Sequence, residues 1–216
     1  MPPRAAKDRK SYFQVCPVAR ALDVVGDRWT ILILRELLGG PARFNELQAG
    51  LPGIAKNLLT TRLRQLEEDE VLRRTTLHGA THYTLTEHGA AIRPIIEQLG
   101  FWGTKLRRVA PPEYDRSPRA MAMALHAILA RALPYMPEER QVVEVELDSG
   151  HLEFVLGPRP SVSAQPSSEA DARLEAPAQA ISDYLNGDGL DKRSFVLRSG
   201  EREARASLLT VLAAMA

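Results

Sequence analysis

Cysteine is almost absent from this sequence, since Cys16 is the only one. A single cysteine excludes an intrachain disulfide framework and a cysteine-rich zinc site. No uninterrupted apolar run approaches the ~18 residues of a membrane-spanning helix. The N-terminus, Met-Pro-Pro-Arg followed by more charge, lacks the apolar stretch of a signal peptide. We therefore expect a cytoplasmic protein with no membrane partner.

The sequence signatures of common enzyme classes are missing as well. There is no G-x-S-x-G, no glycine-rich phosphate loop and no H-E-x-x-H. The hydrophobic share of 44% and the charged share of 25% are ordinary for a globular protein. We predict that the chain is not an enzyme and has no catalytic residues, no metal ligands and no cofactor.

Charge is distributed unequally between the two halves of the chain, although the net charge is only +1. Residues 1–109 carry 17 Lys and Arg against 11 Asp and Glu, a net charge of +6. Residues 110–216 carry 11 against 16, a net charge of −5. This asymmetry predicts that the first half meets an anionic partner and the second half does not.

A proline-rich stretch separates the halves and predicts two domains. Residues 109–118 contain three prolines and no periodic apolar pattern, as expected of a linker. We expect a DNA-binding and dimerisation domain over 1–108, a linker over 109–118 and an α+β domain over 119–216.

Apolar periodicity in the first half predicts a bundle of helices near residues 17–26, 29–38, 44–47 and 56–69. In the last of these, Leu59, Leu63 and Leu66 form one inward stripe, while Asn57, Thr60, Thr61 and Arg64 share another side. Such side chains can contact base edges in a DNA major groove. A solvated polar face, which most amphipathic helices have, is the alternative interpretation.

The segment after this helix favours the DNA-binding interpretation. Residues 73–85 alternate in the manner of two strands around a turn at Gly79, and the first strand carries the paired arginines Arg73 and Arg74. A basic hairpin directly after a helix–turn–helix forms a wing whose tip can reach the DNA backbone or the minor groove. The order is that of a winged helix–turn–helix domain.

A final helix of the first half follows Thr86, which we expect to cap it, and Pro94 should kink it. Its apolar residues keep helical spacing along one stripe, which predicts either packing against a second copy of the chain or packing on its own domain. The predicted dimer-interface residues are Ile92, Ile95, Ile96, Leu99, Trp102 and Leu106.

Residues 16–103 resemble the HxlR family of winged helix–turn–helix transcription regulators, relatives of the MarR group. The motifs that carry the resemblance are Cys16-Pro17-Val18, Leu22-Asp23-Val24-Val25-Gly26-Asp27-Arg28-Trp29, Ile33-Leu34-Arg35-Glu36-Leu37, Arg43-Phe44-Asn45-Glu46-Leu47, Leu51-Pro52-Gly53-Ile54, Leu59-Thr60, Arg62-Leu63-Arg64-Gln65-Leu66-Glu67, Tyr83-Thr84-Leu85-Thr86 and Gly89, with Pro94 and Trp102. The resemblance implies a homodimer on an inverted-repeat operator in double-stranded DNA, which responds to a signal.

The pattern and the resemblance together predict the DNA-binding residues. They are Arg43, Asn45, Lys56, Asn57, Thr60, Thr61, Arg62, Arg64, Arg73, Arg74, His78, Thr81 and His82. Arg62 lies beside the leucine stripe, so an ion pair or a phosphate contact is expected of it rather than base recognition. Many relatives place Ser at the N-cap of the recognition helix, where this chain has Ala55, and Asn57 can take over part of that capping role.

Cys16 has two interpretations. In some relatives a cysteine at the Cys-Pro position senses oxidants or electrophiles, and a thiolate near a helix N-terminus reacts faster than an ordinary thiol. Without a second cysteine, only an intersubunit bond or a small-thiol adduct can form. The alternative is a buried, inert cysteine.

The second half predicts a sheet covered by helices. A helix is expected over 119–133, a hairpin over 143–156 with its turn at 148–150, weaker strands near 161–164, 172–175 and 195–198, a helix from Pro177 and an apolar terminal helix. The order resembles the sterol carrier protein type 2 fold over about 139–216. That resemblance implies an apolar tunnel without catalytic residues.

The apolar residues of this half predict a pocket for an apolar small-molecule effector. Its lining is expected from Val143, Val145, Leu152, Phe154, Ile181, Leu208 and Met215; a packing domain with a filled core is the alternative. We conclude that the sequence favours a transcription regulator with a C-terminal sensing domain. The competing class is a lipid-binding carrier or scaffold whose basic half makes protein contacts. The operator, the sign of regulation and the effector are not encoded in any motif.

Overall fold

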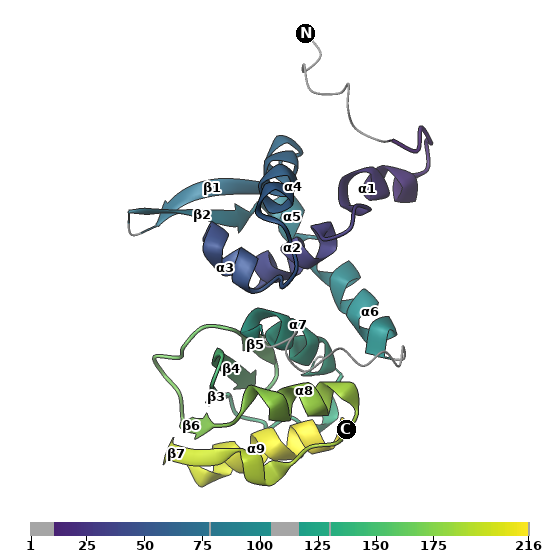
Figure 1. Ribbon diagram of the computed structural model, residues 1–216. Helices are drawn as coiled ribbons and strands as arrows, with labels where there is room; N and C mark the ends of the chain where they lie inside the picture. The colour runs from purple at the N-terminus through teal and green to yellow at the C-terminus, as the bar shows by residue number, and fades with distance from the viewer. Residues whose placement is uncertain (1–10, 78, 105–116, 130, 216) are drawn as a thin grey trace. The chain divides into compact units, whose positions relative to one another are not determined.

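The computed structural model describes residues 11–77, 79–104, 117–129 and 131–215 (Figure 1). The chain divides into two compact units, one of residues 1–37 with 41–90 and one of residues 38–40 with 91–216. The fold class is the predicted one, an N-terminal winged helix–turn–helix followed by an α+β domain of sheet and helices. No helix among the described residues is both long and apolar enough to span a bilayer.

The first unit is built from short helices and one hairpin. Its elements are α1 (Pro17–Val25), α2 (Thr30–Leu38), α3 (Phe44–Ala49), α4 (Lys56–Glu68), β1 (Leu72–Leu77), β2 (Ala80–Leu85) and α5 (Glu87–Ala90). The two strands pair antiparallel from Leu72 opposite Leu85 to Leu77 opposite Ala80, and Gly79 takes a φ of 75° in the turn. Turns of this kind favour glycine, because a side chain disfavours positive φ.

The core of this unit is aliphatic. Ile33 and Leu34 of α2, Leu47 of α3 and Leu59 of α4 are fully buried. Leu47 and Leu59 lie on the apolar side of an amphipathic helix, whereas α2 is apolar nearly all round, as expected of a helix at the centre of the unit. Thr86 caps the short α5 rather than the helix with the apolar stripe, since its Oγ1 accepts a hydrogen bond from the backbone N–H of Gly89 (3.0 Å).

The predicted kink at Pro94 is wrong. The structure has two separate helices, α5 and α6 (Arg93–Thr104), and Pro94 lies in the first turn of α6. A first-turn proline costs no helical hydrogen bond, because the first N–H groups of a helix have no partner within it. Proline therefore starts a new helix here.

The second unit continues with α7 (Pro118–Leu129), a 3₁₀ turn η1 (Leu133–Tyr135), α8 (Ala178–Asn186), a second 3₁₀ turn η2 (Lys192–Ser194) and α9 (Arg202–Ala213). Its strands are β3 (Gln141–Leu147), β4 (Gly150–Leu156), β5 (Ser161–Ser163), β6 (Ala172–Glu175) and β7 (Val196–Gly200). They form one sheet in the order β5-β4-β3-β6-β7, in which only the β3–β6 pair is parallel.

The predicted hairpin turn has a second role in this unit. Asp148 lies between β3 and β4, and its Oδ1 accepts a hydrogen bond from the backbone N–H of Ala178 at the start of α8 (2.9 Å). Pro177, the N-cap residue of α8, makes no side-chain capping bond. The carboxylate from the turn therefore satisfies one of the free N–H groups at this helix start.

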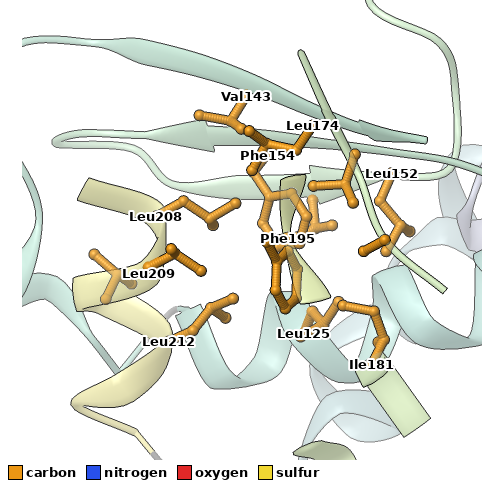
Figure 2. Packing of buried hydrophobic residues seen from close by; sticks show 14 of the residues in the cluster. Leu125, Val143, Leu152, Phe154, Leu174, Ile181, Phe195, Leu208, Leu209 and Leu212 are labelled. Atoms are coloured by element: carbon orange, nitrogen blue, oxygen red, sulfur yellow. The ribbon is translucent and has the colours of Figure 1, made fainter. Parts of the chain in front are cut away.

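Aromatic and aliphatic side chains fill the space between sheet and helices (Figure 2). Phe154 and Phe195 lie at the centre with no exposed surface, and leucines from α7 and α9 approach from the helical side. The Tyr184 hydroxyl ties α8 to α9, because it donates to the carbonyl of Leu212 (3.0 Å). Burial raises the pKa of Tyr184 to about 12.

Replacement of Phe195 by Ala should destabilise the second unit by about 3–5 kcal/mol, because the substitution removes a fully buried ring and leaves a cavity. Chemical denaturation of the full chain, followed by far-UV circular dichroism, measures the loss. Val196→Ala is the matched control, since Val196 is the next residue and 47% exposed. Equal midpoints for the two variants would contradict the packing described here.

Candidate nucleic-acid interface

Helix α4 presents a polar face opposite its buried stripe. Leu59, Leu63 and Leu66 are at most 1% exposed. Asn57 and Thr60 are exposed, and the Arg64 side chain is 65% exposed with Glu68 at 3.7 Å. A weak surface ion pair of this kind contributes about 0–1 kcal/mol, so it leaves the guanidinium available to a stronger acceptor.

The start of α4 confirms the sequence-based view of its capping. Ala55 is the N-cap residue and provides no side-chain bond. Asn57, an exposed residue, accepts a hydrogen bond at Oδ1 from the backbone N–H of Leu58 (2.8 Å). The hydroxyls of Thr60 and Thr61 donate to the carbonyls of Lys56 and Asn57, both at 2.9 Å. Their methyl groups are then the parts free to contact a partner.

The β1–β2 hairpin lies directly after α4 in the chain and packs against it (Figure 1). Arg73 and Thr81 are exposed on it, whereas His78 lies outside the described residues. The hydroxyls of Thr75 and Thr84 face each other across the strands at 3.1 Å. The hairpin therefore offers a polar surface beside the exposed face of α4.

Arg74 is tied to the recognition helix. Its Nε and Nη2 donate to Glu67 Oε2 of α4, at 3.0 and 2.6 Å. The hydrogen bond and the charge of Glu67 raise the pKa of Arg74. Because both side chains reach solvent, the pair contributes little stability and a phosphate can compete for the guanidinium.

His82 differs from the sequence expectation of a DNA contact. It is only 9% exposed, its Nδ1 lies 3.0 Å from the carbonyl of Ala80, and its Nε2 accepts from Arg43 Nε at 3.4 Å. These two contacts occupy both ring nitrogens and require the tautomer protonated at Nδ1. The inward position follows from the strand register, which sends alternate side chains to opposite faces.

Three further predicted residues lie at helix starts, two at that of α3 and one at that of α4. Arg43, Asn45 and Lys56 are exposed. The backbone N–H of Arg43 donates to Glu46 Oε2 (2.7 Å), which caps the start of α3. Arg62 is different: its side chain is only 17% exposed, and it pairs with Asp27 and with Gln65 Oε1 (2.7 Å). Of the two outcomes expected for Arg62, the structure contains the ion pair.

The predicted dimer residues are not equivalent in the structure. Ile95, Leu99 and Trp102 of α6 are 62%, 47% and 59% exposed, whereas Ile96 is buried and Ile92 is half-buried. Leu106 lies outside the described residues. Helix α6 therefore buries one side within the second unit and leaves an apolar row exposed on the other.

Cys16 is exposed at the N-cap position of α1, with Pro17 directly after it. The expected burial of Cys16 is therefore wrong, while its role as a sensor stays a prediction. The predicted pocket residues are part of the packed core of the second unit. Six of them have no exposed surface, namely Val143, Val145, Leu152, Phe154, Ile181 and Leu208, and Met215 packs against the same core. The pocket stays a prediction, and a ligand there has to open a packed core.

These features are those of a winged helix–turn–helix protein that binds DNA. Residues 24–110 match the family described as HxlR-like helix-turn-helix. YdeP of Bacillus subtilis, an HTH-type transcriptional regulator, is 37% identical over 98 residues, which cover 44% of this chain and 77% of YdeP. YybR of the same organism, also an HTH-type transcriptional regulator, is 37% identical over 97 residues, which cover 44% of this chain and 78% of YybR. The chain therefore belongs to the HxlR-like family of DNA-binding transcriptional regulators.

Two solved structures with similar sequences have names that state a redox role or a bound quinone. The redox regulator HypR in its oxidized form shares 37% identity over 44% of this chain and all of HypR, with a TM-score of 0.41. Quinone-bound YodB from Bacillus subtilis shares 35% identity over 42% of this chain and 99% of YodB, with a TM-score of 0.38. The four relatives together match the first half of the chain, and the resemblance of the second half to a sterol carrier fold stays a prediction.

Proposed function

We propose that this chain is a homodimeric transcription regulator that binds an inverted repeat in double-stranded DNA. Helix α4 serves as the recognition helix, and the β1–β2 hairpin contacts the flanking backbone. The observation that carries the proposal is the exposed row of Asn57, Thr60 and Arg64 on a helix whose other face is fixed by three buried leucines. Asn and Arg side chains in a major groove distinguish adenine and guanine, respectively.

The proposed contacts fall into two groups. Asn57, Thr60, Thr61 and Arg64 read bases, while Arg43, Asn45, Lys56, Arg73, Arg74, His78 and Thr81 contact phosphates. Phosphate contacts fix the register of the protein on DNA, and base contacts specify the sequence. We do not propose His82 as a DNA contact. Its ring accepts the Arg43 Nε–H and so orients the Arg43 side chain.

The exposed apolar row of α6 supports the proposed dimer. Ile95, Leu99 and Trp102 lie at spacings of four and three residues, so they share one helix face, and each is at least 47% exposed. A symmetric pair of such faces would bury the row. The inverted repeat bound by such a dimer would have its half-sites about one DNA turn, ~34 Å, apart.

The second unit is proposed to modulate DNA binding. Its apolar interior supports an apolar effector, and the packed state of that interior supports the filled-core alternative equally well. Chemical denaturation of the full chain with and without a fatty acid separates the effector pocket from the filled core. A fatty acid at 100 times its Kd stabilises the protein that binds it by ~2.7 kcal/mol. A lipid carrier or scaffold is the second candidate function; it predicts such stabilisation without salt-dependent DNA binding.

Two arginine substitutions test the DNA-binding proposal in a gel-shift assay. Arg73→Ala should reduce the negative slope of log affinity against log salt by ~0.9 and leave sequence preference unchanged, because one phosphate contact is lost. Arg64→Ala should relax the choice of base at one position of each half-site. Arg159→Ala, an exposed arginine of the second unit, is the control. Arg73→Ala and Arg64→Ala variants that both match the control would refute the interface.

Trp102→Ala tests the dimer. Tryptophans at interface centres commonly contribute 2 kcal/mol or more, so the dimer dissociation constant should rise roughly 30-fold, as measured by sedimentation equilibrium. Leu133→Ala is the control, since Leu133 is an apolar residue of the second unit with 53% exposure. A dissociation constant that moves equally in both variants would remove α6 from the interface.

Cys16 is proposed as a redox sensor, supported by its exposure and by the names of HypR and quinone-bound YodB among the relatives. Diamide should change the DNA affinity of the wild type, through an intersubunit disulfide or a small-thiol adduct, and should leave Cys16→Ser unchanged. Because the chain has no other cysteine, the comparison assigns any thiol effect to this residue. An identical response of the two proteins would end the sensor proposal.

A further inference from the structure

Arg62 lies on α4 but points away from the face proposed to meet DNA. Its guanidinium forms an ion pair with Asp27, in the turn between α1 and α2, and its Nη1 donates to Gln65 Oε1 (2.7 Å). The side chain is 17% exposed, against 65% for Arg64. Two residues along a helix correspond to about 200° of rotation, so these arginines occupy opposite sides of α4.

The same turn contacts the chain just before α4 through Trp29. A Cβ placed on Gly53 would lie 3.7 Å from the Trp29 ring, so the ring lies against the turn that leads into α4. Trp29 has a φ of 82°, a left-handed conformation that costs about 1–3 kcal/mol in a bulky residue and persists only where packing fixes it. The turn between α1 and α2 therefore contacts the middle of α4 through Asp27 and the chain that leads into α4 through Trp29.

We propose that Arg62 is a positioning residue of the DNA-binding site: through Asp27 it fixes the orientation of α4 against the α1–α2 turn. This inference rests on the proposed role of α4 as the recognition helix. The orientation of α4 sets which base edges Asn57, Thr60 and Arg64 reach. The Asp27–Arg62 pair is therefore a determinant of sequence preference without touching DNA.

The charge of Asp27 separates this role from a phosphate contact. If Arg62 bound a phosphate, Asp27 would compete for the guanidinium and repel DNA, so its neutralisation would tighten binding to any sequence. In a positioning role, neutralisation of Asp27 releases Arg62 and weakens only the binding that depends on the orientation of α4. The two roles predict effects of opposite sign for one substitution.

The experiment uses the full-length chain and two DNA duplexes. One duplex is selected from a random library by the wild-type protein, and the other is a scrambled sequence of equal length and composition. Dissociation constants are measured between about 50 and 200 mM salt for the wild type, Asp27→Asn, Arg62→Gln, the double variant and Arg64→Gln. Thermal unfolding of each variant is recorded in parallel.

Asp27→Asn and Arg62→Gln should each lower the ratio of selected to scrambled affinity about tenfold, with the salt slope unchanged. The double variant should lose no more than either single one, because both substitutions break the same interaction. Tighter binding of Asp27→Asn to both duplexes, or a slope reduced by ~0.9 in Arg62→Gln, would overturn the positioning role. Asp27 is 57% exposed, so Asp27→Asn alone decides the sign if Arg62→Gln does not fold.

Arg64→Gln distinguishes the failure of this inference from that of the proposed function. If Arg64→Gln loses selectivity while Asp27→Asn matches the wild type, only the positioning role of Arg62 is refuted. If the wild type selects no duplex, or Arg64→Gln equals the wild type on both duplexes, the role of α4 as the recognition helix is refuted.

Discussion

The burial of one leucine stripe on α4 is the constraint on which the interface depends. Leu59, Leu63 and Leu66 lie within the core of the first unit. At roughly 1.5–3 kcal/mol for each buried leucine, this stripe outweighs every surface ion pair on the helix. It therefore sets the rotation of α4 about its axis, and the polar residues on the opposite side become exposed as a consequence. The pairs that Glu67 and Glu68 form with arginines add little to this, because their side chains reach solvent.

Periodicity in the sequence was sufficient to predict most of the architecture. Most elements occur close to the expected residues, because each buries one side on which apolar residues are regularly spaced. They include the helices of the first unit, the hairpin after α4, the hairpin of the second unit and α8. The fold class followed from their order. The break before Pro94 was missed because a proline within an apolar pattern is compatible with either a kink or a new helix start, and local spacing does not distinguish them.

The candidate site was predicted less completely, for a physical reason. The face of a helix or strand on which a residue lies follows from the local sequence. The residue with which its side chain pairs does not. Arg43 and His82 are 39 positions apart in the chain, and Arg62 of α4 pairs with Asp27 of the turn between α1 and α2. Such pairs depend on the tertiary packing of α2, α4 and the hairpin, which no spacing rule reports. No spacing rule indicated the buried position of His82, because alternation along the strand places it on the face opposite to the apolar Tyr83 and Leu85.

The path of the chain between the two units has a consequence for how the protein can be divided. Leu38, Gly39 and Gly40 belong to the second unit although the helix–turn–helix surrounds them in the sequence, so the backbone passes between units three times. Within the second unit, Arg93 donates to the carbonyl of Leu38 (3.0 Å) and Arg119 to that of Gly40 (2.8 Å). A fragment that ends before Arg119 therefore leaves the Gly40 carbonyl without this donor at the junction of α2 and α3. The proline-rich stretch of residues 109–118 is therefore not a point at which the chain can be cut without loss of a tertiary hydrogen bond.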